Sequence, residues 1–291
     1  MRKVGIIIAL IITILLAGCA NENFENNQST KRENPKEEKE TGFQVEHSSQ
    51  NAEDKQEKAQ VKTKEITEQD GPKYTVAENA TIVPINKDIN EKVVLLTIDD
   101  VPDKYFLDMA KTLKQLDANA IFFVNGHFLH TKEQKDFLKQ IHDMGFVIGN
   151  HTYSHAKLPD LTEQEQTKEI VKVSDQIEEI IGERPKFFRA PHGMNTDHSK
   201  QVAKQEGMVI MNWTYGYDYF APYQDAKKLT KAMVSGEGPE VDVPYSLLKP
   251  GANLLMHDRE WTNKALKDIV TGLREKGYEM VDPHTIKTLN Y

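Results

Sequence analysis

Short apolar segments alternate with longer, partly apolar segments along the second part of the chain, from about residue 75 onward. The run at residues 93–98 is apolar and rich in β-branched side chains, as is typical of a strand buried on both faces. Further strands of this kind are predicted at residues 120–124, 146–149, 186–189, 208–212, 253–256 and 278–281. Between them, apolar residues recur every three or four positions and predict helices, the clearest at residues 106–116, 137–144, 162–181 and 262–276.

Strands and helices that alternate regularly predict a parallel sheet with crossover helices. We expect this sheet to close into a distorted (β/α) barrel of about seven parallel strands. The helix after Leu161 has a clear start, because Thr162 and Glu165 form a capping-box pattern. In barrels of this type the chemistry lies at the carboxyl ends of the strands, so polar residues that directly follow a strand are the candidates for function.

The first residues resemble an export signal. Arg2 and Lys3 precede an apolar run at residues 4–17, which is too short for a typical membrane-spanning helix. The run ends in Leu-Ala-Gly before Cys19, the only cysteine of the chain, and this pattern resembles a bacterial lipoprotein signal. We therefore expect a signal peptide at residues 1–19, lipidation of Cys19, and a lipid anchor at the extracytoplasmic face of the cell membrane. An ordinary signal peptide or signal anchor is the alternative.

The next segment is polar and the last one is not. Residues 20–73 are rich in Glu, Lys, Gln and Asn and hold too few apolar side chains to form a core, which predicts a disordered tether. Residues 74–291 are then the folded domain, for which we expect a monomer. The net charge of −8 argues against a nucleic-acid partner, which requires a basic surface.

Five clusters of polar residues follow five of the predicted strands. They are Asp99-Asp100, the segment from His151 to His155, the segment from Arg189 to Gly193, Trp213 with Asp218-Tyr219, and His257. Two imidazoles four positions apart can converge on one cation. Taken singly, the Asp pair is explained as a turn or cap, Arg189 as an ion-pair partner and His257 as a structural histidine. Three further acids, Asp103, Asp160 and Asp258, are expected to be caps or loop acids. Taken together, the clusters indicate a metal site with a spare carboxylate, an arginine and a further histidine.

These clusters resemble the motifs of the polysaccharide deacetylase family, with NodB homology, over about residues 90–285. The corresponding segments are Thr97-Ile98-Asp99-Asp100, His151-Thr152-Tyr153-Ser154-His155, Arg189-Ala190-Pro191-His192-Gly193, Trp213 with Asp218, and Leu255-Met256-His257. Two positions depart from the family. Val101 stands where glycine is usual, which predicts a reshaped loop. Asp218 follows Trp213 by five positions, a loose match to the fourth motif.

The resemblance implies a ligand set for a divalent metal. Asp100, His151 and His155 would hold it, and two histidines with one carboxylate suit Zn²⁺, although Co²⁺, Ni²⁺ or Fe²⁺ accept the same ligands. The metal and the backbone N–H of His192 would stabilise the oxyanion, and Pro191 would stiffen this loop.

The resemblance also implies catalytic roles. Asp99 would be the general base, Arg189 would orient it, His257 would be the general acid, and Asp218 would orient His257. Three aromatic residues, Trp213, Tyr215 and Tyr219, are candidates for stacking on sugar faces. For Trp213, packing in the core is at least as good an explanation.

The implied reaction is the hydrolysis of N-acetyl groups on an amino-sugar polysaccharide such as peptidoglycan, with release of acetate. An O-acetyl esterase acting on a xylan-like glycan is one alternative, because the same site could cleave either bond. A carbohydrate-binding lipoprotein without catalytic activity is another, although the presence of Asp99 and His257 argues against it.

Overall fold

A computed structural model describes residues 71–289 of this protein. The signal peptide at 1–19, its Cys19, and nearly all of the tether at 20–73 lie outside these residues. Lys73 is already tied to the folded part, because its N–H donates to the carbonyl of Thr285 at 2.8 Å. Within residues 71–289, no helix is both long enough and apolar enough to span a bilayer.

A seven-stranded sheet forms the centre of the domain, and every pairing in it is parallel. The hydrogen-bonded order is β7-β6-β5-β4-β3-β8, and β9 pairs with the start of β3. The predicted strands are therefore confirmed, with bounds β3 (Val93–Val101), β4 (Ile121–Val124), β5 (Val147–Asn150), β6 (Phe187–Phe188), β7 (Val209–Ile210), β8 (Ala252–His257) and β9 (Glu279–Met280).

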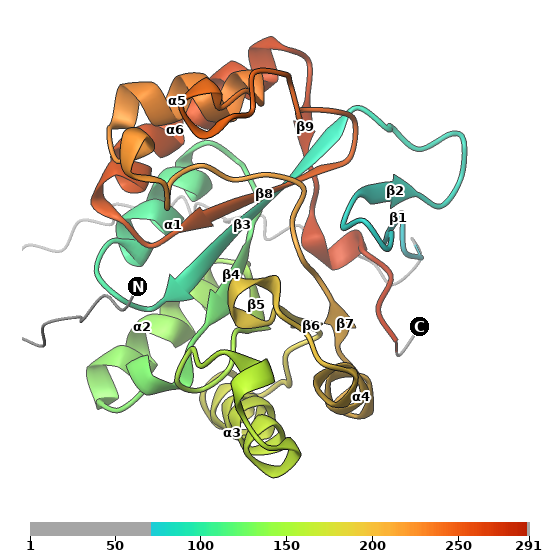
Figure 1. Cartoon of the computed structure of the whole chain (residues 1–291), viewed down its shortest axis with the longest axis vertical. Helices are drawn as coiled ribbons and strands as arrows, with labels where there is room; N and C mark the ends of the chain where they lie inside the picture. Colours follow the sequence, from blue (N-terminus) through green and yellow to red (C-terminus); the bar gives the residue numbers. More distant parts are fainter. Residues whose placement is uncertain (1–70, 290–291) are drawn as a thin grey trace, which may run out of the picture. The chain divides into compact units, whose positions relative to one another are not determined.

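The sheet curls into a half-barrel, and helices cover its outer side (Figure 1). Its two edge strands, β7 and β8, do not pair directly. The chain beyond β7 instead reaches β8 through one parallel bridge between Tyr215 and Leu254. Around this bridge, the N–H of Thr214 donates to the carbonyl of Asn253 and the N–H of Leu255 to that of Tyr215, each at 2.9 Å. The predicted distorted barrel is thus closed by this bridge instead of by a full strand pair.

Six α-helices accompany the sheet in the described chain: α1 (Phe106–Gln115), α2 (Lys132–Asp143), α3 (Glu163–Ile181), α4 (Asp197–Gln205), α5 (Ala226–Ser235) and α6 (Glu260–Glu275). The predicted capping box of α3 is present: the Thr162 hydroxyl accepts from the N–H of Glu165, and the Glu165 carboxylate accepts from the N–H of Thr162. A second capping box, formed by Thr131 and Gln134, starts α2 earlier than its apolar stripe suggested.

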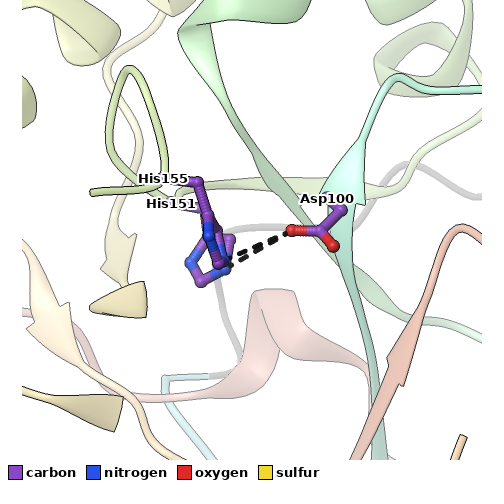
Figure 2. Close-up of side chains that lie close together, drawn as sticks. All are labelled: Asp100, His151 and His155. Carbon is purple, nitrogen blue, oxygen red and sulfur yellow. Dashed lines mark ion pairs between the residues drawn. The ribbon is translucent and has the colours of Figure 1, made fainter. Parts of the chain in front are cut away.

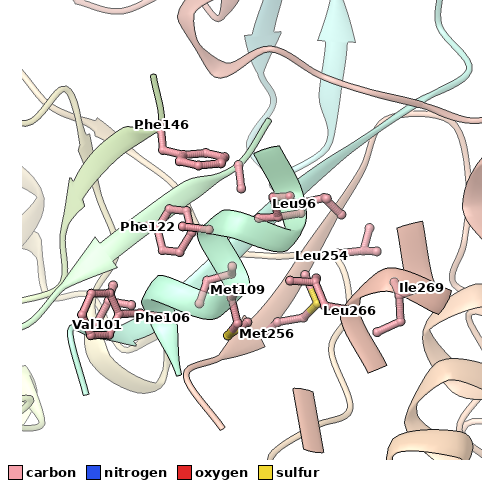
Figure 3. Close-up of a cluster of buried hydrophobic side chains, with 14 of the residues drawn as sticks. Leu96, Val101, Phe106, Met109, Phe122, Phe146, Leu254, Met256, Leu266 and Ile269 are labelled. Atoms are coloured by element: carbon pink, nitrogen blue, oxygen red, sulfur yellow. The ribbon is translucent and has the colours of Figure 1, made fainter. Parts of the chain in front are cut away.

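Alternate residues of β3 enter two different cores. Leu96 and Ile98 face α1 and α6, where they join a cluster shown in part in Figure 3 with Met109, Leu266 and others. A fully buried aliphatic side chain stabilises a fold by about 1.5–3 kcal/mol. Val93 and Leu95 face the other way and pack with Phe123 of β4 and Phe187 of β6, inside the curl of the sheet.

A short antiparallel hairpin precedes the sheet and was not predicted. Its strands are β1 (Tyr74–Val76) and β2 (Ile82–Pro84), too short for their alternation to be recognised in the sequence. Tyr74 and Ile82 pack with Val93 and Leu95, so the hairpin contributes to the inner core near the start of β3. The opposite end of the curl, where β3 ends, is polar.

Candidate active site

The inner face of β3 changes from apolar to polar toward its carboxyl end, where Thr97 and Asp99 follow Leu95. Arg189, directly after β6, is completely buried. Its Nη1 donates to Asp99 Oδ1 at 2.7 Å and to Thr97 Oγ1 at 2.8 Å. Its other nitrogens donate to the carbonyls of Met211 and Asn212. A buried charge needs this degree of satisfaction. Arg189 is therefore fixed, and with it one oxygen of Asp99.

Asp100, His151 and His155 converge beside this pair (Figure 2). Asp100 Oδ1 lies 3.9 Å from His151 Nε2 and 3.5 Å from His155 Nε2, and one ligand atom from each residue lies within 4.8 Å of the others. Ligand bonds of about 2.0–2.1 Å in a tetrahedral site place neighbouring ligand atoms about 3.4 Å apart. The three side chains therefore fit a single metal ion of this size.

The protonation states also fit a metal. Burial lowers the pKa of His151, and it lowers that of His155 to about 4, aided there by the neighbouring His151. Burial would raise the pKa of Asp100, but His257, His151, His155 and Arg259 together lower it. Neutral imidazoles and a charged carboxylate are the forms that bind metals. His151 Nδ1 contacts the carbonyl of Arg189 at 2.8 Å, which directs its Nε2 toward the carboxylates.

Four residues around the site have a left-handed backbone although none is glycine. Their φ angles are +62° for Asp100, +67° for Thr152, +59° for His155 and +58° for His192. Non-glycine residues seldom adopt such angles, and they gather at functional sites. Asp100, His155 and His192 come from three separate segments of the chain, and all three line the same cavity.

Val101, the position for which a reshaped loop is expected, is the last residue of β3. It is fully buried in the core beneath α1 and pairs with Val124 of β4. The left-handed residue is its neighbour Asp100, and the sheet register shifts between Ile98 and Val101 to accommodate it. The peptide bond from Val101 to Pro102 is cis.

His257 ends β8 directly opposite Asp99 of β3. Its Nδ1 contacts Asp218 Oδ1 at 2.8 Å, and its backbone N–H donates to Asp218 Oδ2 at 2.6 Å. Asp218 is fully buried and also accepts from the hydroxyl of Thr262. Asp218, the loosest match in the sequence, thus lies where it can orient His257. Burial lowers the pKa of His257, but the charge of Asp218 and its hydrogen bond outweigh this and raise the pKa to about 9.

The imidazole of His257 is expected to titrate near pH 9 in the metal-free protein, and at a clearly lower pH in Asp218→Asn. Without the charge of Asp218, burial is the largest remaining influence, and burial disfavours the protonated form. An NMR titration of the imidazole carbons measures both values. Asp225→Asn, the same change at the cap of α5, serves as the control. A similar midpoint in Asp218→Asn and in the native protein would contradict this assignment.

A cavity of about 400 Å³ opens over the site, lined by Asp99, Asp100, His151, His155, His192, Trp213, Tyr219, Leu255, His257 and Arg259. Tyr219 is 46% exposed and Trp213 is half-buried, so both can offer a ring to a sugar. Tyr215 cannot, and its proposed stacking role was wrong. It is buried in the core, where its hydroxyl donates to the carbonyl of Met233 at 2.7 Å.

Two site residues were not found from the sequence. Arg259 donates from Nη2 to Asp100 Oδ2 at 2.7 Å, and Asn253 on β8 lies 3.4 Å from Arg189. The position of Arg259 just beyond a strand end was the signal that could have identified it. Asp258 between His257 and Arg259 is a loop cap as expected, because its carboxylate accepts from three consecutive backbone N–H groups, those of residues 103–105.

Comparison with known proteins agrees with this arrangement. The sequence model for polysaccharide deacetylase matches residues 86–211. A peptidoglycan-N-acetylglucosamine deacetylase of Bacillus cereus is 31% identical over 201 residues, which are 66% of this chain and 70% of that protein. A second one from the same organism is 34% identical over 126 residues, 43% of this chain and 45% of the relative.

Solved structures agree as well. A carbohydrate esterase family 4 pseudoenzyme from Bacillus anthracis superposes with a TM-score of 0.58 and 28% identity, over 67% of this chain and 65% of that one. The sequence relatives, the half-barrel and the residues gathered at its carboxyl end lead to one conclusion: the chain belongs to the polysaccharide deacetylase family.

Proposed function

We propose that this protein is a metal-dependent deacetylase that hydrolyses N-acetyl groups of the amino sugars in peptidoglycan. The observation that carries the proposal is the complete set of side chains around one cavity. They are three candidate metal ligands, a further carboxylate bonded to Arg189, and a histidine bonded to Asp218. The two Bacillus cereus relatives act on peptidoglycan N-acetylglucosamine, which supports the same class of substrate here.

Each side chain has a task in this reaction. Asp99 accepts the proton of the attacking water, since Arg189 binds only one of its oxygens. His257, whose raised pKa keeps it protonated at neutral pH, donates a proton to the departing amine. In the turn after β6, the N–H groups of Gly193 and Met194 already donate to the carbonyls of Ala190 and Pro191. We therefore assign the N–H of His192 as the donor that stabilises the oxyanion. A zinc ion bound by Asp100, His151 and His155 would lower the pKa of its bound water to about 7 and polarise the acetamide carbonyl.

A carbohydrate-binding protein without turnover is the second candidate, and the pseudoenzyme among the structural neighbours favours keeping it in the test. The intact set of side chains favours the enzyme. Acetate released from peptidoglycan, chitooligomers and acetylated xylan by the full-length protein tests both, with Asp99→Asn as the inactive control. Release from peptidoglycan above the control supports the proposal. Release from xylan alone would favour an O-acetyl esterase, and release from none of them a binding protein.

We further propose that Cys19 carries a lipid that holds the enzyme at the outer face of the cell membrane, next to the cell wall. More than one acyl chain is needed for stable anchoring. Cys19→Ala is expected to move the protein out of the membrane fraction or leave its signal uncleaved. Fractionation with lipid labelling measures this, and no other cysteine can take the label. A labelled Cys19→Ala protein that stays in the membrane would refute the anchor.

A further inference from the structure

Arg259 links the end of β8 to the candidate metal ligand Asp100. It is the N-cap residue of α6 and lines the site cavity. Its Nη2 donates to Asp100 Oδ2 at 2.7 Å. Its Nη1 donates to the carbonyl of Asp258 at 3.0 Å and lies 3.7 Å from the carboxylate of Asp103. The guanidinium therefore has two further partners besides Asp100, both at Nη1.

The two oxygens of Asp100 consequently have different partners. Oδ2 faces Arg259, whereas Oδ1 faces the Nε2 atoms of His155 and His151, at 3.5 and 3.9 Å. A charge-assisted hydrogen bond of this length is strong enough to fix a carboxylate orientation. Without it, both oxygens of Asp100 could bind one cation, because carboxylates readily act as bidentate ligands.

We propose that Arg259 is a positioning residue that restricts Asp100 to one metal-binding oxygen. Catalytic zinc sites combine three protein ligands with an open position for water or substrate. By occupying Oδ2, Arg259 keeps that position from being filled by a second oxygen of Asp100. This inference rests on the proposed metal-dependent function and adds a residue to its machinery.

Two other roles would leave different signatures. If Arg259 contacted the substrate directly, its loss would raise KM and leave the metal environment unchanged. If it only stabilised the start of α6, its loss would lower the melting temperature without altering the bound metal. Partners around metal ligands typically change metal affinity or activity by about 10–100-fold when they are removed.

The test compares Arg259→Met and Arg259→Lys with the native protein, each measured with zinc and with cobalt. Arg274→Met is the matched control, because Arg274 lies at the far end of α6 and binds the carbonyls of Leu116 and Asp117. In Arg259→Met we expect one zinc per chain, a kcat on peptidoglycan about 10–100-fold lower, and a little-changed KM. We also expect weaker visible absorption of the cobalt form, because cobalt absorbs less as its coordination number rises. Arg259→Lys keeps a donor and the charge, and is expected to recover part of both signals.

A cobalt spectrum in Arg259→Met identical to that of the native protein would overturn the proposal, whatever happens to activity. Loss of stoichiometric zinc would also overturn it, because Arg259 would then be needed for binding and not for dividing the two oxygens. The spectrum and the metal content require no turnover. If the native protein binds metal but releases no acetate, the proposed function fails while this inference is still decided by the spectra.

Discussion

Asp99→Asn is expected to lose turnover by about 10²–10⁴-fold while it keeps its metal, because general base catalysis typically contributes a factor of that size. The asparagine carbonyl can still accept from Arg189, which binds Asp99 Oδ1 at 2.7 Å, so the buried guanidinium keeps a partner. The amide group cannot accept a proton from water at neutral pH. Asp100→Asn and His151→Ala are expected to lose stoichiometric metal, since each removes one of three converging ligands.

Elemental analysis after dialysis, together with acetate release, separates these variants. Asp99 Oδ2 lies 3.5 Å from His151 Nε2, which is as near as Asp100 Oδ1 lies to His155, so the two carboxylates compete for the ligand role on distance alone. Each carboxylate also gives one oxygen to an arginine, Asp99 to Arg189 and Asp100 to Arg259, so the family resemblance assigns Asp99 as the base. An empty Asp99→Asn with a metal-loaded Asp100→Asn would show that the two roles are reversed.

His257→Ala is expected to reduce N-deacetylation by about 10²–10⁴-fold, with a smaller loss on an activated ester such as nitrophenyl acetate. An amide nitrogen must be protonated before it can leave, whereas a nitrophenolate leaves without an acid. Its pKa of about 9 keeps His257 protonated at neutral pH and able to supply that proton.

The measurement is kcat/KM on both substrates beside a zinc assay. His284→Ala, a change of the same type at an exposed residue outside the cavity, is the control. Metal content should stay intact, because His257 faces Asp218 and is not one of the three converging ligands. Equal losses on amide and ester, or a parallel loss of zinc, would exclude His257 as the acid.

The sequence located most of the site because parallel strands end at one edge of the sheet. Asp99, His151, Arg189 and His257 each lie at or next to the carboxyl end of a strand, and a parallel sheet brings such positions together whatever their separation along the chain. Asp218 follows no strand that the structure forms, since β7 ends at Ile210. Its role of orienting His257 came from the family resemblance alone, and the bond between the two side chains gives the physical reason.

Contacts that depend on side-chain direction could not be predicted. Tyr215 and Tyr219 are four positions apart and chemically identical. Tyr215 pairs with Leu254 of β8 and is buried, whereas Tyr219 is exposed. The pairing of Arg259 with Asp100 joins residues 159 positions apart. The pattern of strands predicts which elements lie side by side, but it does not predict which tyrosine or arginine side chain points into a cavity.

The left-handed backbone at Asp100, Thr152, His155 and His192 sets stability against function in this domain. An L-residue pays roughly 1–2 kcal/mol for that conformation, and whole domains are stable by only about 5–15 kcal/mol. Glycine would relieve the cost at any of the four positions, but at Asp100 or His155 it would delete a candidate ligand. Selection for heat resistance therefore cannot act freely on Asp100 and His155. A thermostable relative with the same chemistry must gain its extra stability elsewhere, in the helices or in the hairpin at the opposite end of the sheet.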